Sequence, residues 1–120
     1  MTMDYKRSDR VADLLQREIA ELVFRRLKDP RVANLTISGV KVTDDLRNAR
    51  VFFCLMGRDA DEAGRKSALA GLDKARGFMR LELGRRLSLR YVPQLTFEYD
   101  TSFEYGDKME RLLKELHKDE

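Results

Sequence analysis

The residues best suited to chemistry in this sequence are basic side chains gathered between residues 65 and 90. That stretch carries eight lysines and arginines against two acidic residues, Asp73 and Glu82. The ammonium and guanidinium groups of such residues bind phosphate oxygens through charge and hydrogen bonds. Residues 91–120 carry the opposite excess, with eight acidic and four basic residues. This asymmetry predicts a polyanion-binding face on one side of the molecule.

One glycine lies inside the basic stretch, in the run Lys74-Ala75-Arg76-Gly77. Glycine removes the side chain at a point where a nucleic-acid backbone can come close, and the N-terminus of a following helix attracts phosphate. The Ala-x-Gly pattern is weak alone, but the cations around it make it more specific. We predict RNA contacts from the following residues: Lys74, Ala75, Arg76, Gly77, Arg80, Arg85, Arg86, Arg90, Arg65 and Lys66.

Simpler roles stay open for part of this set. Arg65 and Lys66 could simply solubilise a helix face rather than contact RNA. The arginines between residues 85 and 90 could instead pair with the acidic tail. Basic residues between 8 and 28, such as Arg10 and Arg17, share a helix face with acidic ones. Ion pairs within the helix are favoured there over RNA contacts.

The sequence offers no support for catalysis. It contains no nucleophile–histidine pair, no cluster of metal ligands and no phosphate-cradling P-loop. The single cysteine, Cys54, lies in an apolar run and is expected to be a small buried hydrophobe, and the single histidine is His117. We therefore predict a binding protein without cofactor or metal. An adaptor that docks on an acidic protein, and an enzyme with an unrecognised site, remain the competing hypotheses.

The length and hydropathy of the chain indicate one domain, residues 1–120. No apolar run approaches the roughly 20 residues that span a bilayer. The first residues lack the apolar segment of a signal peptide. We therefore expect a cytoplasmic protein that binds no membrane.

The elements that must position the cations follow from periodicity. Residues 8–28 predict an amphipathic helix in which Glu18 interrupts the apolar stripe, and Asp29-Pro30 ends it. Residues 34–43 predict a strand whose buried parity shifts at Gly39, which indicates a bulge. Residues 49–56 predict a central strand, of which Phe53 or Phe52 is core. The other phenylalanine is expected to pack under the terminal helix.

The second half of the chain predicts a helix opened by Asp59 and Glu62, which kinks or breaks at Gly77. A strand is expected within residues 88–100, entered near Pro93, and a last helix over about 107–118. A three-stranded sheet with helices on one face accommodates all of these elements. The predicted fold class is α+β, with the α-β-β-α-kink-α-β order of a type II KH domain.

The chain resembles the ribosome-binding factor A family over nearly its whole length. The resemblance is carried by residues 29–32, 38–46, 49–52, 75–80 and 92–100, among them Asp29-Pro30-Arg31-Val32 and Ala75-Arg76-Gly77-Phe78. It implies a type II KH-like fold in which Ala-x-Gly at a helical kink replaces the Gly-x-x-Gly of other KH domains. Residues 75–77 match that position.

The resemblance also implies a function. Members of the family are monomers that bind the free small ribosomal subunit, or its late precursor, through rRNA at the neck and decoding region. They assist late rRNA processing and growth in the cold, and an assembly GTPase releases them. We therefore expect this chain to be a small-subunit assembly factor with no enzymatic activity.

Overall fold

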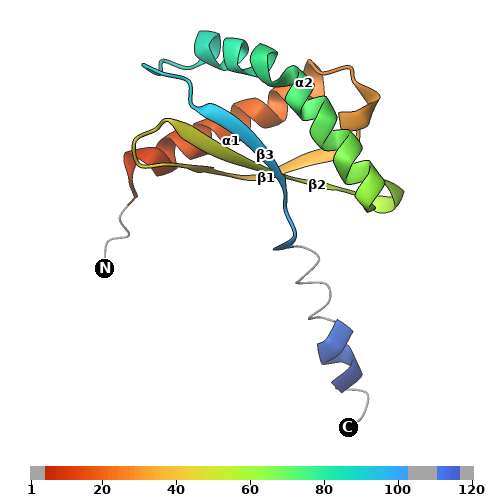
Figure 1. Ribbon diagram of the computed structural model, residues 1–120. Helices are drawn as coiled ribbons and strands as arrows, with labels where there is room; N and C mark the ends of the chain where they lie inside the picture. Colours follow the sequence, from red (N-terminus) through yellow and green to blue (C-terminus); the bar gives the residue numbers. More distant parts are fainter. Residues whose placement is uncertain (1–4, 103–110, 117–120) are drawn as a thin grey trace.

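The computed structural model describes residues 5–102 and 111–116, with the side chains of residues 58 and 59 excepted. The elements follow one another as helix, strand, strand, helix and strand, as the sequence predicts (Figure 1). They are α1 (Arg7–Arg25), η1 (Pro30–Val32), β1 (Leu35–Val42), β2 (Asn48–Leu55), η2 (Gly57–Ala60), α2 (Glu62–Arg86) and β3 (Gln94–Tyr99). The fold is α+β, and the predicted class is confirmed.

The three strands form one mixed sheet in the order β1-β2-β3. β2 pairs antiparallel with β1 and parallel with β3, so the apolar strand is central, as predicted. The register of β1 shifts between Ile37 and Gly39, which confirms the bulge expected there. Pro93, which has no N–H to donate, directly precedes β3.

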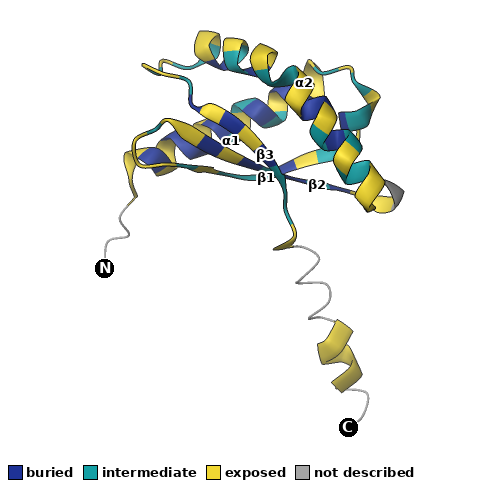
Figure 2. Cartoon of the chain, in the orientation of Figure 1, coloured by how far each residue is buried: buried dark blue, intermediate teal, exposed yellow. Residues whose placement is uncertain are grey.

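Both long helices lie on one face of the sheet, and the core forms between the two layers (Figures 1 and 2). The stripe of α1 that carries Leu15, Ile19 and Leu22 is fully buried. Phe53 projects from β2 into the same core and meets Tyr99 edge to face, with ring centroids 5.5 Å apart. The helices therefore expose their outer faces, on which the candidates Lys66, Lys74, Gly77 and Arg85 of α2 lie.

The helix bounds differ from those predicted in two places. α1 ends at Arg25, a few residues before Pro30, and α2 begins at Glu62 rather than at Asp59. The N-cap of α2 is Asp61, whose side chain accepts a hydrogen bond from the Gly64 N–H. α2 also runs through Gly77 without a break, although Figure 1 shows its axis changing direction where the colour passes from green to teal.

The turn after α1 is fixed against α2 by the Asp29-Pro30-Arg31 run. The Asp29 carboxylate accepts hydrogen bonds from the backbone N–H of Arg31 at 2.9 Å and from its guanidinium. These bonds lower the pKa of Asp29 to about 2. A Cβ on Gly71 of α2 would lie 3.0 Å from Val32 Cγ1, so a larger residue would require η1 to move away from the helix by a few tenths of an ångström.

Residues 111–116 are helical, within the terminal helix predicted over 107–118. Its expected ends, including the Asp107 and Glu110 capping box, lie outside the described residues. The described helix is exposed on all sides and stands away from the domain in Figure 1. Phe52 is therefore not packed under residues 111–116, and the rest of the predicted helix lies outside the part of the chain that the structure describes. The Phe52 ring instead lies beneath Lys41 and Arg50.

Candidate nucleic-acid interface

Arg86, predicted to contact RNA, occupies the interface between α1 and α2. Its guanidinium lies 3.2 Å from Glu18 Oε2, 3.6 Å from Glu21 Oε1 and 3.7 Å from Glu82 Oε2. The Arg86 and Glu18 side chains are about three-quarters buried. This network explains why an acidic residue interrupts the apolar stripe of α1, because Glu18 has its counter-ion on the neighbouring helix.

Arg80 also has partners inside the domain. Its guanidinium donates hydrogen bonds to the carbonyl oxygens of Val92, at 2.9 Å, and Pro93, at 3.2 Å. These two carbonyls belong to the segment that enters β3, so Arg80 ties α2 to the sheet. Arg76 pairs with Asp73 one turn earlier and lies 5.8 Å from the centroid of the Phe97 ring. Both arginines therefore face the sheet rather than the outside of the helical layer.

Arg65, at the N-terminal end of α2, stacks over Tyr99 of β3. Its guanidinium carbon lies 4.0 Å from the ring centroid, and its Nε donates to the Ala60 carbonyl at 3.1 Å. A cation this close to an aromatic face is held by the ring quadrupole. The neighbouring Lys66 is exposed and pairs with Glu62 of its own helix, at 3.8 Å.

The exposed cations among the predicted set are Lys66, Lys74, Arg85 and Arg90. Arg85 is 73% exposed and lies 3.7 Å from Glu82, a contact that contributes little at the surface. Arg90 lies beyond the end of α2, with its guanidinium 5.7 Å from the Tyr91 ring centroid. These side chains, unlike the four arginines above, are available to a ligand.

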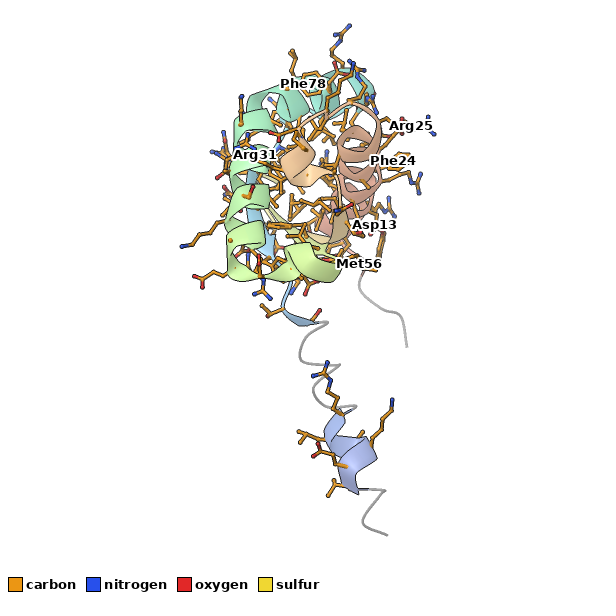
Figure 3. All side chains as sticks on the ribbon, turned by 90° about the vertical axis from the view of Figure 1, so that its right-hand side faces the viewer. Asp13, Phe24, Arg25, Arg31, Met56 and Phe78 are labelled. Atoms are coloured by element: carbon orange, nitrogen blue, oxygen red, sulfur yellow. The ribbon has the colours of Figure 1, made fainter. Side chains whose placement is uncertain are left out.

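A groove of about 340 Å³ lies between the C-terminal end of α1 and the middle of α2. We call it the basic groove. Its lining is Arg26, Leu27, Lys28, Asp29, Gly71, Lys74, Ala75 and Phe78. Figure 3 looks at this side of the molecule, with Phe24 and Arg25 on α1 and Phe78 on α2. The groove brings the predicted residues Lys74 and Ala75 together with Arg26 and Lys28 from the segment that follows α1.

Gly77 is exposed on α2 and directly precedes Phe78, which lines the basic groove. It is in a continuous α-helix and does not have a positive φ, so its backbone does not require glycine. A Cβ built on it meets no atom within 4 Å, so internal packing does not require glycine either. Glycine in a helix interior costs about 1 kcal/mol relative to alanine. At Gly77 this loss of stability is accompanied by a point on the helix that has no side chain and is open to solvent. We call it the bare helix segment.

Sequence reasoning missed Arg26, Lys28 and Phe78 as parts of this site. A usable signal was present, because the last residues of α1 and the three that follow read Phe24-Arg25-Arg26-Leu27-Lys28, a basic run with an 84% exposed phenylalanine. The run precedes the Asp29-Pro30 turn, which returns the chain against α2 and so joins two basic segments distant in sequence.

The described part of the chain contains no group of three or more histidine, cysteine or acidic side chains that could hold a metal ion. Cys54 is partly buried, and burial raises the pKa of its thiol. Among the described helices none is long and apolar enough to cross a membrane. The chemistry offered by the described surface is therefore that of cations, a bare helix segment and exposed aromatic rings.

The sequence of this chain also matches a family of known proteins. Residues 7–113 match the family described as ribosome-binding factor A. A ribosome-binding factor A from Syntrophobacter fumaroxidans is 68% identical over 118 residues, which cover 98% of this chain and 100% of the relative.

Solved structures share the fold. The crystal structure of ribosome-binding factor A from Thermus thermophilus superimposes with a TM-score of 0.65 at 28% identity, covering 77% of this chain and 94% of that one. A Thermus thermophilus coordinate set fitted into a cryo-EM map of a 30S–RbfA complex gives a TM-score of 0.61 at 29% identity, covering 75% of this chain and 91% of that one. On the family match and these likenesses together, this chain belongs to the ribosome-binding factor A family.

Proposed function

We propose that this protein binds the free small ribosomal subunit through rRNA and assists a late step of its maturation. The related Thermus thermophilus protein has been fitted into a complex with the 30S subunit, and this chain has the same fold. The observation that carries the proposal is the basic groove with the bare helix at Gly77 beside it. Cations from α2 and from the segment that follows α1 line the groove, and a Cβ at the neighbouring Gly77 would meet nothing within 4 Å.

The charges at the groove favour a polyanion. Arg25, Lys28 and Lys74 form no ion pair within the described residues, while the one carboxylate that lines the groove, Asp29, is bound to Arg31. Arg85 is also exposed on α2, eleven residues further along the helix than Lys74. Each cation that meets an RNA phosphate releases a condensed counter-ion, which favours binding.

The proposed interface therefore differs in part from the set that the sequence suggests. We assign RNA contacts to Lys74, Ala75, Gly77 and Arg85, with Lys66 and Arg90 farther from the groove. We add Arg26 and Lys28 from the segment that directly follows α1. The inward-facing arginines have a different role, which is to hold the domain together and so to fix the geometry of the groove. They are Arg65, Arg76, Arg80 and Arg86.

The finer parts of the proposal follow from family membership. They are a role in late rRNA processing and in growth in the cold, release by an assembly GTPase, and action as a monomer in the cytoplasm. A binding role without catalysis is supported by the chemistry of the described surface, which offers cations and aromatic rings for recognition.

A gradient sedimentation experiment tests the proposal. The purified full chain is mixed with free small subunits, free large subunits or assembled bacterial ribosomes, and each gradient fraction is assayed for the protein. We expect it in the small-subunit fraction alone, because assembly factors act before the subunits join. Equal occupancy of small subunits and assembled ribosomes, or of small and large subunits, would contradict the proposal, as would failure to bind any particle.

A further inference from the structure

An aromatic ring is exposed at the rim of the basic groove. Phe78 of α2 is 36% exposed and lines the groove directly after the bare Gly77. The guanidinium carbon of Arg26 lies 5.6 Å from the centroid of its ring. Removing a phenylalanine ring from water stabilises a fold, so a ring that stays partly in water beside a groove is available to a ligand.

The groove combines a planar apolar surface with positive charge. Gly71 and Ala75 contribute no long side chain to it, and the ring of Phe78 stays 36% exposed. The position of Gly71 is fixed, because η1 packs against it within van der Waals contact. Arg26, Lys28 and Lys74 supply three cations around this space. A nucleotide, which joins a flat base to a phosphate, has the matching chemistry.

We propose that Phe78 is a stacking platform for an unpaired RNA base, whose adjacent phosphates are bound by Lys28 and Lys74. The inference rests on the proposed function and specifies which RNA the site takes. Bases in an A-form duplex are stacked on one another and face a deep, narrow major groove, so they cannot reach the ring. Loops, bulges and single-stranded ends present their bases freely, and these are the segments that the groove selects.

Arg26 takes part in the same contact. Its guanidinium already lies on the Phe78 ring, and an arginine plane stacks on bases as well as on aromatic side chains. Asp29, the acidic residue of the groove, does not oppose an RNA phosphate as a free charge, because its carboxylate is held by Arg31 at 2.6 Å. The groove is therefore electrostatically open to the anion.

Fluorescence anisotropy with a labelled single-stranded RNA and a duplex of the same length tests the proposal. The full chain is compared with Phe78→Leu, which keeps an apolar side chain and removes the ring. The matched control is Phe24→Leu, which removes an 84% exposed ring outside the groove lining. Circular dichroism verifies that each variant is folded, and Phe78→Tyr tests rescue by another ring.

We expect Phe78→Leu to weaken single-stranded RNA binding roughly tenfold, which lies within the range measured for loss of one base–aromatic stack. Duplex binding and the salt dependence should stay unchanged, Phe24→Leu should match the wild type, and Phe78→Tyr should retain binding. Equal affinity of Phe78→Leu and wild type for single-stranded RNA would overturn the proposal. So would equal losses for single strand and duplex.

Two further measurements distinguish a failure of the stacking inference from a failure of the proposed function. Polyglutamate of the same charge as the RNA is added as a competitor, and stronger displacement by the peptide than by unlabelled RNA would mark the groove as a protein-docking site. Binding to free small subunits is measured in parallel. If wild type and Phe78→Leu bind subunits equally well, only the stacking inference fails, whereas absence of wild-type binding contradicts the proposed function itself.

Discussion

Two adjacent arginines of α2 are expected to give opposite results when each is replaced by alanine. Arg86→Ala should lower the free energy of unfolding by about 2 kcal/mol, because it leaves the largely buried Glu18 carboxylate without its cation and removes one of the two arginines beside the largely buried Glu82. Arg85→Ala should change stability by less than about 0.5 kcal/mol, because the Arg85 side chain is 73% exposed. The two variants remove the same charge one residue apart.

Chemical denaturation measures the stability of both variants, and anisotropy with single-stranded RNA measures binding at a temperature at which both are folded. We expect Arg85→Ala to bind more weakly than wild type and Arg86→Ala to bind with nearly wild-type affinity. If Arg86→Ala proves as stable as wild type, the ion-pair network does not hold the helices together. If instead Arg86→Ala loses the larger part of RNA binding, its side chain belongs to the interface.

The second large effect is expected at Gly77, where stability and binding should change in opposite directions. Gly77→Ala should stabilise the protein by about 1 kcal/mol, because the helix gains a better helix former and the new Cβ meets nothing within 4 Å. The same methyl group should weaken binding to small subunits severalfold, since it occupies the space through which the RNA backbone approaches. Thermal unfolding and subunit binding are measured on one preparation.

The other glycines of α2 are the controls for this experiment. Gly84→Ala adds a methyl group to the same helix at another exposed position, where its Cβ lies 3.4 Å from Val92 Cγ2, and should leave binding unchanged. Gly71→Ala should destabilise the protein, because its Cβ would lie 3.0 Å from Val32 Cγ1. Wild-type binding by Gly77→Ala would show that the bare helix segment is not a contact point.

The sheet was predictable from the sequence because its signals are local. Three signals each reflect the environment of neighbouring residues. They are the alternation of apolar and polar residues in β1 and β3, the parity shift at Gly39, and the proline before β3. The continuous apolar run of β2 similarly indicated a strand flanked on both sides. Even the anomaly in α1, Glu18, was visible, although its partner Arg86 lies 68 residues further along the chain.

The side chains of the candidate interface were harder to predict, because a cationic side chain can either pair with groups inside the domain or stay exposed to a ligand. Arg80 and Arg86 differ from Lys74 and Arg85 in the direction in which α2 presents them. All four of these side chains are positively charged. Once the axis of α2 changes direction, a fixed helical spacing no longer indicates which side faces the sheet. The contribution of Arg26 was hidden for a different reason, since it depends on how the Asp29-Pro30 turn packs α1 against α2.

The salt dependence of binding to the free small subunit tests the central claim most directly. If cations of the basic groove and of α2 neutralise rRNA phosphates, log affinity falls linearly with log salt, with a slope of about −0.7 to −0.9 per phosphate. The double variant Lys74→Ala with Arg85→Ala should bind more weakly, and its slope should be shallower by about 1.5.

The matched control is Arg10→Ala with Arg17→Ala, which removes two exposed arginines from the outside of α1 and changes the net charge by the same amount. We expect that control to keep the affinity and slope of the wild type within about 0.5 of a slope unit. A wild-type slope for the variant at Lys74 and Arg85, or equal losses for both double variants, would contradict the account, because the groove and its helix would then contribute only general positive charge.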